Sequence, residues 1–390
     1  MKRLGILGST GSIGRNCLSV VADHPDRFRV VSLTAGQNAN LMAEQVMAVQ
    51  PVLVSMADET AARQLCERLR EAGYRNIPEI SYGRQGMIEA STLPEVDMVL
   101  SSTVGVAGLP ATYEALRAGK QVALANKEVL VAAGELVTAA ARARSLELLP
   151  VDSEHSALHQ CLRAGRREEA CRLVLTASGG PFLHTPAEDV ESATVEEALQ
   201  HPTWKMGSRI TIDSATMMNK GFEVIEACWL FGFAPQQVRV KIHPQSIVHS
   251  LVEFIDGSIL AQISVTDMRV PILYALAYPE RVASRNHRFE WESLTSLQFY
   301  EPDMSRFPCL KLAYETMEAG GSYPCALNAV DEVAVAAFLD REIPFGAINR
   351  LIAEVLQNIP DRRFSSMEDV LDHDQLCRAM ARESISHLRD

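Results

Sequence analysis

The feature that most constrains the fold is a glycine-rich turn near the start of the chain. Gly8, Gly11 and Gly14 follow an apolar run at residues 4–7, and a helical pattern begins at Ile13. Glycine permits a tight turn and lets backbone N–H groups approach a pyrophosphate at a helix N-terminus. A strand, this loop and a helix together predict a dinucleotide-binding domain. A tight turn without a ligand is the alternative interpretation.

The first 150 residues alternate between strand and helix patterns. Continuous apolar strands that are separated by helices predict a parallel sheet covered on both faces. The predicted fold class is therefore α/β, with an N-terminal Rossmann-like, doubly wound parallel sheet over residues 1–150. Strands are expected at residues 4–7, 29–34, 52–55, 96–101, 121–124 and 146–151, and helical patterns include 13–22, 40–49, 61–72 and 127–143.

The pattern changes after residue 151. Strand-like runs among irregular segments predict a central α/β catalytic domain over residues 151–277, and the charged stretch 278–308 is interpreted as a linker. The remainder, 309–390, is helical almost throughout, which predicts a C-terminal helical bundle. Strands are expected at residues 173–177, 209–213, 238–243 and 259–264, and C-terminal helices at 309–319, 326–340, 345–358, 366–370 and 374–388.

The overall charge limits the class of partner. The formal net charge is −12, which argues against a nucleic-acid partner because such a partner favours a basic surface. No run approaches the roughly 18 apolar residues of a membrane helix, and the N-terminus leads directly into a strand without a signal-peptide pattern. The eight cysteines are scattered and form no C-x-x-C pair, as is typical of reduced thiols. We therefore expect a cytoplasmic protein without a membrane partner.

The segment after the second predicted strand bears on which dinucleotide is bound. An NAD site normally has an acid here, which accepts a hydrogen bond from the ribose 2′-hydroxyl. Residues 31–38 contain no acid, and this absence favours NADP over NAD because a carboxylate would repel a 2′-phosphate. Gln37 and Asn38 offer only neutral hydrogen bonds, so the indicated preference is weak.

Another set of polar residues follows a later strand. Asn126, Lys127 and Glu128 come after the strand expected at 121–124 and open a helix. Ligands of open α/β sheets bind at the carboxyl ends of strands, so Lys127 is expected to meet a substrate or the nicotinamide ribose. A helix N-cap at Asn126 followed by a surface ion pair is the alternative.

Two carboxylates follow the strand expected at 146–151. Asp152 and Glu154 are two residues apart, so in an extended chain they point to the same side. Hard oxygen ligands suit Mg²⁺ or Mn²⁺ rather than Zn²⁺. Glu223, on a later predicted helix, would complete a site of three carboxylates. An acid pair at a helix N-terminus is an equal interpretation.

The polar segment 201–226 supplies donors for a phosphate group. Ser214, Asn219 and Lys220 offer hydroxyl, amide and ammonium donors around an expected loop, a set that suits a phosphate oxyanion. Ser178 lies in a second glycine-rich turn after a strand and offers another hydroxyl. A plain turn without a ligand explains Ser178 equally well.

These motifs together closely resemble one family, the 1-deoxy-D-xylulose 5-phosphate reductoisomerases of the non-mevalonate isoprenoid pathway. The resemblance spans essentially the whole chain. It implies an N-terminal NADPH domain, a central catalytic domain with a mobile flap, a C-terminal helical bundle, and a homodimer that forms through the central domain. The matching stretches are residues 7–14, 125–128, 150–155, 178–182, 201–207, 212–221 and 242–246.

The resemblance also implies roles for individual residues. The metal ligands would be Asp152, Glu154 and Glu223, and these would act in catalysis with Lys127 and His201. The substrate-binding residues would be Lys127, Ser153, Glu154, Ser178, His201, Trp204, Met206, Ser214, Asn219, Lys220 and Glu223, of which His201, Trp204 and Met206 would lie on the flap. The NADPH-binding residues would be Thr10, Gly11, Ser12, Ile13, Gly36, Gln37, Asn38, Asn126, Glu128 and Gly207. Gln37 departs from the family pattern, because relatives often have a basic residue there.

The family reaction sets what the site is expected to do. It rearranges the carbon skeleton of 1-deoxy-D-xylulose 5-phosphate, a small phosphorylated sugar, and reduces the resulting aldehyde with NADPH to 2-C-methyl-D-erythritol 4-phosphate. The cofactors implied are NADPH and Mg²⁺ or Mn²⁺. One alternative is an NADP-dependent semialdehyde or hydroxy-acid dehydrogenase that needs no metal. Another is an NADP-sensing regulator, which the retained carboxylates and phosphate donors disfavour.

Overall fold

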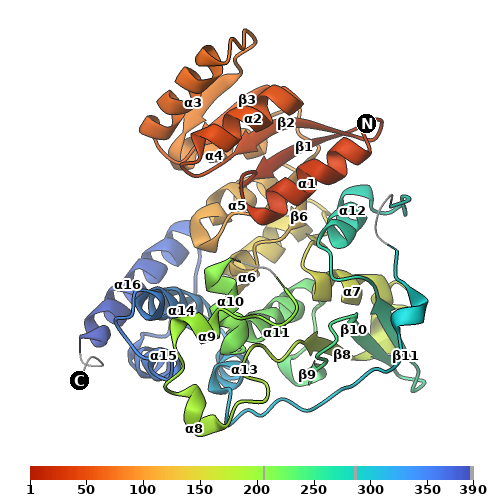
Figure 1. Cartoon of the computed structure of the whole chain (residues 1–390), viewed down its shortest axis with the longest axis vertical. Helices are drawn as coiled ribbons and strands as arrows, with labels where there is room; N and C mark the ends of the chain where they lie inside the picture. Colours follow the sequence, from red (N-terminus) through yellow and green to blue (C-terminus); the bar gives the residue numbers. More distant parts are fainter. Residues whose placement is uncertain (205–206, 285–287, 387–390) are drawn as a thin grey trace. The chain divides into compact units, whose positions relative to one another are not determined.

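The computed structural model describes residues 1–204, 207–284 and 288–386 and confirms the predicted α/β fold class (Figure 1). The chain divides into two compact units. The first contains residues 1–129, 137–156 and 267–288, and the second contains residues 130–136, 157–266 and 289–390. The division falls within helices as well as loops, and the domain boundaries expected at residues 150, 277 and 308 stay a prediction.

The first unit is built on a seven-stranded parallel sheet with the strand order β4-β3-β2-β1-β5-β6-β7. The order reverses at β1, which pairs with β2 on one side and β5 on the other, as in a doubly wound sheet. The carboxyl ends of β1 and β5 therefore flank the position where such folds bind ligands. The strands are β1 (Lys2–Leu7), β2 (Phe28–Thr34), β3 (Leu53–Met56), β4 (Glu79–Tyr82), β5 (Met98–Ser101), β6 (Gln121–Leu124) and β7 (Leu149–Pro150).

Helices connect these strands and bury their apolar faces in one core. That core combines strand residues such as Ile6, Leu33 and Val54 with Cys17 of α1 and Met42 of α2. The sequence patterns did not include β4, because Glu79–Tyr82 is short and half-exposed. The helices are α1 (Ser12–Asp23), α2 (Ala39–Val49), α3 (Glu59–Glu71), α4 (Gly83–Thr92), α5 (Leu109–Arg117), α6 (Glu128–Ala143) and α12 (Arg269–Ala277), with a short 3-10 turn η1 (Gly105–Gly108).

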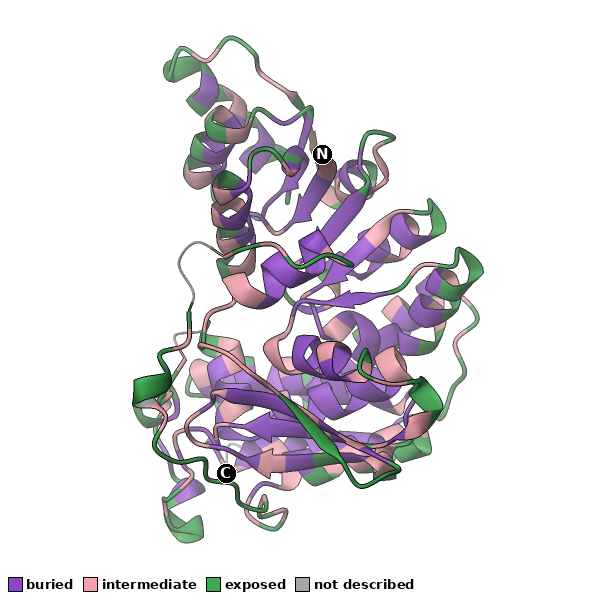
Figure 2. Cartoon of the chain, turned by 90° about the vertical axis from the view of Figure 1, so that its right-hand side faces the viewer, coloured by how far each residue is buried: buried purple, intermediate pink, exposed green. Residues whose placement is uncertain are grey.

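The second unit contains a four-stranded mixed sheet with the order β11-β10-β8-β9. β8 runs parallel to β9, and β10 runs antiparallel to β8 and to β11. One face packs on α7 and α11 in a core that includes Leu158, Val224 and Val240. β11 is the edge strand and is largely exposed (Figure 2). The strands are β8 (Ala170–Ala177), β9 (Val238–Ile242), β10 (Val248–Phe254) and β11 (Ile259–Ile263).

The C-terminal helices share a core with the helices that connect β8 to β9. Phe222 and Ile225 pack in one cluster with Val330, Leu351 and residues of the last helix. Within the described residues, no helix is both long and apolar enough to cross a membrane. The helices of this unit are α7 (Ser153–Leu162), α8 (Ala187–Val190), α9 (Val195–Ala198), α10 (Ser208–Ala215), α11 (Met218–Phe231), α13 (Pro308–Ala319), α14 (Tyr323–Leu339), α15 (Ala347–Asn358) and α16 (Met367–Ile385), with 3-10 turns η2 (Arg167–Glu169), η3 (Pro235–Gln237) and η4 (Trp291–Ser293).

Two expectations about local structure are wrong. The strand expected at 209–213 is part of helix α10, in which Ile212 and Ala215 are buried three residues apart. The alternation of Ile210 and Ile212 resembled a strand, but the helix places Arg209 and Asp213 on one face. The two helices expected at 366–370 and 374–388 are a single helix, α16, because no glycine or proline interrupts the segment between them.

Candidate active site

The glycine loop forms the N-terminus of α1, and glycine is required there for close packing. Gly8 has a φ of +83°, and a Cβ at Gly14 would lie 2.5 Å from the Gly8 carbonyl oxygen. Gly11 is the N-cap of α1, and the first turn of this helix contains no acidic residue. Thr10, Gly11, Ser12 and Ile13 are each at least partly exposed at this helix end. The free N–H groups of a helix N-terminus attract anions, so the loop can receive a phosphate.

The loop after β2 is exposed at Gly36, Gln37 and Asn38. The side chain of Asn38 accepts a hydrogen bond from the Leu41 N–H at 3.1 Å and caps α2. Gln37 donates through Nε2 to Oδ2 of Asp58 at 3.3 Å. Asp58 lies 21 residues beyond Gln37 and was not among the predicted site residues. Only the pairing of β2 with β3 brings the two loops together.

Asn126 holds the loop that follows β5. Its Nδ2 donates to the carbonyl oxygens of Thr103 at 2.6 Å and Gly105 at 2.8 Å, while its Oδ1 accepts from the Val129 N–H at 3.3 Å. Oε1 of Glu128 accepts from the Gly105 N–H at 3.3 Å. Asn126 and Glu128 thus brace the ends of β5 and β6, at the carboxyl edge where the sheet order predicts a ligand.

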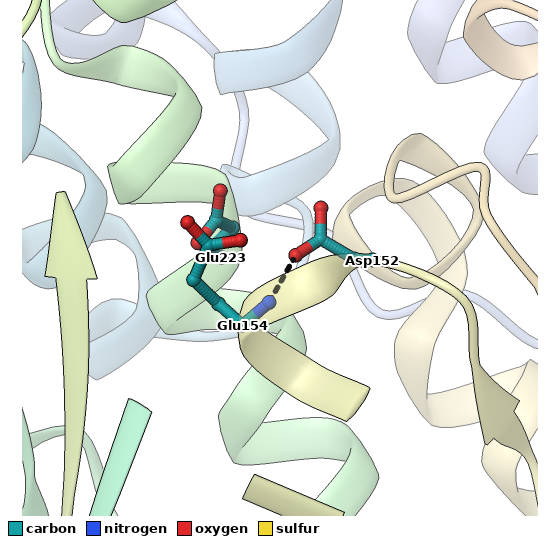
Figure 3. Close-up of side chains that lie close together, drawn as sticks. All are labelled: Asp152, Glu154 and Glu223. Carbon is teal, nitrogen blue, oxygen red and sulfur yellow. Dashed lines mark hydrogen bonds between the residues drawn. The ribbon is translucent and has the colours of Figure 1, made fainter. Parts of the chain in front are cut away.

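The three carboxylates that were predicted to bind a metal come together. Asp152, Glu154 and Glu223 each offer one oxygen, and these oxygens all lie within 4.8 Å of one another (Figure 3). Asp152 precedes α7, and its Oδ1 accepts a hydrogen bond from the Glu154 N–H at 3.1 Å. Glu223 lies in α11 and is buried. Three converging carboxylate oxygens are the hard ligands that Mg²⁺ and Mn²⁺ prefer, so the donor set fits a divalent cation.

Two lysines contact these carboxylates. Lys127 donates to Oδ2 of Asp152 at 3.0 Å, and Lys220 forms an ion pair with Glu223. Both lysines are buried. Asn219 also donates to Oε1 of Glu223 at 2.7 Å. Buried carboxylates need compensating charge, and the ammonium groups supply it here. Asn219 and Lys220, which were predicted as phosphate donors, thus contact a predicted metal ligand.

His201 lies beside Ser178, with 3.0 Å between His201 Nε2 and Ser178 Oγ. The other ring nitrogen, Nδ1, accepts from the N–H groups of Thr203 at 3.2 Å and Trp204 at 2.9 Å. Burial lowers the pKa of His201, which favours the neutral ring. A neutral ring whose Nδ1 accepts must carry its proton on Nε2, so His201 donates to the Ser178 hydroxyl.

The glycine turn after β8 approaches α10 closely. Gly179 and Gly180 have φ values of +89° and +67°, and a Cβ at Gly180 would lie 2.6 Å from the Ser214 carbonyl oxygen. The turn therefore brings the backbone beside Ser178 against the helix that carries Ser214. Gly207 is the N-cap of α10 and is exposed. Met206 lies outside the described residues.

Three segments of the chain match one family. Residues 4–134 match 1-deoxy-D-xylulose 5-phosphate reductoisomerase, residues 148–231 match its C-terminal domain, and residues 263–380 match the DXP reductoisomerase C-terminal domain. Together these matches cover most of the chain.

Full-length relatives and solved structures agree with this match. The chain is 52% identical over 385 residues to 1-deoxy-D-xylulose 5-phosphate reductoisomerase of Solibacter usitatus. The aligned region covers 98% of this chain and 97% of the relative. The protein of that name from Chlorobium phaeobacteroides is 49% identical, with 98% of each chain covered. The chain also matches a crystal structure of DOX-P reductoisomerase in complex with NADPH, fosmidomycin and magnesium. The two sequences are 40% identical, the TM-score is 0.93, and the match covers all of both chains. The Zymomonas mobilis enzyme in complex with NADPH is 41% identical, with a TM-score of 0.91 over 98% of this chain and 99% of that one.

Proposed function

The chain belongs to the 1-deoxy-D-xylulose 5-phosphate reductoisomerase family, and we propose that Asp152, Glu154 and Glu223 are the metal ligands of its active site. The enzyme is NADPH- and divalent-metal-dependent, and it converts 1-deoxy-D-xylulose 5-phosphate to 2-C-methyl-D-erythritol 4-phosphate in isoprenoid biosynthesis. The observation that carries the residue assignment is the convergence of three carboxylate oxygens within 4.8 Å.

At the reacting end of the substrate, the carboxylates would hold the metal ion, and the lysines beside them would orient the carboxylates and contact the substrate. A divalent ion held by the three carboxylates supplies a Lewis acid for the ketone and hydroxyl oxygens of the substrate. Lys127 orients Asp152 through its hydrogen bond of 3.0 Å, and its ammonium group is proposed to contact substrate oxygens. Ser153 begins α7 beside these ligands and is proposed to contact the substrate backbone.

The phosphate end of the substrate is assigned to donors on α10, α11 and the turn after β8. Ser178, Ser214, Asn219 and Lys220 are the proposed phosphate ligands. His201 holds the Ser178 hydroxyl through Nε2, and the Thr203 and Trp204 N–H groups hold His201 through Nδ1. Phosphate binding at Ser178 would therefore be transmitted to the segment that carries Trp204. We propose that this segment is the flap that covers the substrate and excludes water, and that Met206 belongs to it.

The cofactor is assigned to the carboxyl edge of the first sheet. The N-terminus of α1, with Thr10, Gly11, Ser12 and Ile13, would bind the pyrophosphate. Gly36, Gln37 and Asn38 would contact the adenosine ribose, and Asn126, Glu128 and Gly207 would line the nicotinamide half. Since the loop after β2 ends in exposed polar groups, its contacts decide how the 2′ position of the ribose is recognised.

The experiment that tests the function is NADPH oxidation with 1-deoxy-D-xylulose 5-phosphate, with and without Mn²⁺. We expect turnover that EDTA abolishes and Mn²⁺ restores, with the product identified by mass. Glu223→Gln should lose turnover while it retains NADPH affinity, with Glu226→Gln on the same helix as the matched control. Activity that survives EDTA would instead indicate a metal-free dehydrogenase.

We further propose a homodimer that forms through the edge strand β11. Ile255 and Ile259 are 70% and 58% exposed, and one side of β11 has no partner strand among the described residues. Unprotected apolar edge strands favour pairing with another chain, and a second copy offers a matching edge. Ile259→Lys should yield a monomer in sedimentation experiments, whereas Val52→Lys, at an exposed apolar residue of the first unit, should not.

A cytoplasmic location belongs to the same proposal. All eight cysteines are free thiols, and six of them are buried. Free thiols of this kind are typical of proteins in a reducing compartment.

A further inference from the structure

The loops at the carboxyl ends of β2 and β3 form one surface in the first unit. Thr34 pairs with Ser55, the last ladder position of these parallel strands. Beyond that pair, the Ala35 N–H donates to the Ser55 carbonyl oxygen at 3.0 Å, and the Ala57 N–H donates to the Gly36 carbonyl oxygen at 3.2 Å. The backbone thus holds the two loops together, and the residues after β3 lie beside the residues after β2.

This backbone arrangement brings a carboxylate to Gln37. Asp58 caps α3, since its Oδ1 accepts from the Ala61 N–H at 2.9 Å. Its second oxygen, Oδ2, accepts from Gln37 Nε2 at 3.3 Å. Within the described part of the chain, the side chain of Asp58 accepts these two hydrogen bonds, and neither comes from a lysine or arginine. Its negative charge is therefore held in place by a helix, and no lysine or arginine among the described residues forms an ion pair with it.

Gln37 stands where dinucleotide-binding folds recognise the adenosine ribose. An acid after the second strand accepts a hydrogen bond from a 2′-hydroxyl, and a basic residue accommodates a 2′-phosphate. Gln37 is exposed, and the neighbouring Gly36 leaves space, because a Cβ there would meet no atom within 4 Å. Since one N–H of Nε2 donates to Asp58, Oε1 and the second N–H of the amide are the groups of Gln37 left for a ligand. A 2′-hydroxyl can donate to Oε1, whereas an ionised 2′-phosphate offers only acceptors and can use only the one N–H that Asp58 leaves.

We propose that Asp58, acting through Gln37, is a specificity-determining residue that reduces the preference of this enzyme for NADPH over NADH. The inference rests on the proposed NADPH site. The carboxylate acts in two ways. It repels the doubly charged 2′-phosphate, and it occupies one of the two amide N–H donors that Gln37 could otherwise offer to that phosphate. The 2′-hydroxyl of NADH meets neither penalty.

The test is equilibrium binding of NADPH and of NADH to the full-length enzyme, followed by nicotinamide fluorescence without substrate. Asp58→Asn removes the charge but keeps an oxygen that can cap α3. It should tighten NADPH binding by about two- to sixfold, the effect expected of one exposed charge, and change NADH binding by less than about twofold. Glu59→Gln is the matched control, because it removes the same charge from the adjacent, exposed residue, whereas the carboxylate that accepts from Gln37 is that of Asp58. This control should leave the ratio of the two affinities unchanged.

The salt dependence of binding and a substitution at Gln37 test the same charge effect independently. The NADPH gain of Asp58→Asn should shrink as the salt concentration rises, because screening weakens exposed charges. Gln37→Arg should raise the NADPH-to-NADH affinity ratio, and the double variant should raise it further than Gln37→Arg alone. Equal effects of Asp58→Asn on both dinucleotides, or equal effects of Asp58→Asn and Glu59→Gln on their ratio, would overturn the proposal. A wild-type enzyme that binds neither dinucleotide would instead refute the proposed NADPH site.

Discussion

A methyl group added at Gly14 probes how closely the glycine loop is packed. The Cβ of an alanine here would lie 2.5 Å from the Gly8 carbonyl oxygen, 2.5 Å from Ser9 Cα and 2.6 Å from the Ser9 carbonyl oxygen. All three atoms belong to the main chain, so no side-chain rotation relieves the contact. The loop and α1 would have to separate by roughly 0.9 Å to restore ordinary van der Waals distances. Overpacking of this kind costs about 1–3 kcal/mol of folding free energy.

The same displacement should also weaken cofactor binding, by a free energy comparable with its cost to folding. A shift of about 1 Å in a positioning element can cost as much as ~10²-fold, so we expect Gly14→Ala to bind NADPH ten- to a hundredfold more weakly. Nicotinamide fluorescence measures the affinity, and urea unfolding measures the stability. Gly36→Ala is the control for folding, because no atom lies within 4 Å of its added Cβ. If Gly14→Ala matched the wild type in both measurements, the close packing derived from the structure would be refuted.

Three further perturbations test other parts of the molecule. Glu223→Gln should lower turnover by at least about a hundredfold, since metal Lewis acidity is worth several kcal/mol, and unchanged kcat with saturating Mn²⁺ would remove Glu223 from the metal site. His201→Gln, which can still donate to Ser178, should retain a lower KM for the substrate than His201→Ala, and steady-state kinetics that show equal KM values would contradict the hydrogen bond of 3.0 Å. Burial, together with the nearby Asp213, raises the pKa of Asp331 well above its usual value. A folded pKa above the unfolded one stabilises the protein below the unfolded pKa and loses that stabilisation as the pH rises. Asp331→Asn should therefore stabilise the protein at pH 8 relative to wild type and less so at pH 5, and urea unfolding at the two pH values would expose a wrong sign.

The local motifs were predictable because each one is defined by residues that lie close together in the sequence. The glycine loop, the carboxylates after β7 and the amphipathic C-terminal helices can each be inferred from spacing over a few residues. The convergence of Asp152, Glu154 and Glu223 was also predicted, partly by resemblance to a family. Spacing alone supported only the first two of these carboxylates, because residues far apart in the chain share no local pattern.

Helix α10 shows where local pattern fails. The alternation of Ile210 and Ile212 predicted a strand, but Ile212 and Ala215 are buried together in the helical core. Tertiary burial outweighed the strand preference of two β-branched residues. The helix in turn allows Arg209 to contact Glu332 of α14 at 3.0 Å, a pairing that sequence separation conceals.

The sequence by itself determined the glycine loop at the start of α1, the parallel α/β architecture and the kinds of side chain available to a metal and a phosphate. It also showed no acid among residues 31–38, which favoured NADP. Only the tertiary structure placed Asp58 beside Gln37, because the order of β2 and β3 in the sheet decides which loops are neighbours. Strand order is set by the burial of whole strands against helices. The acid that bears on the cofactor is therefore supplied by the fold rather than by the segment in which it was sought.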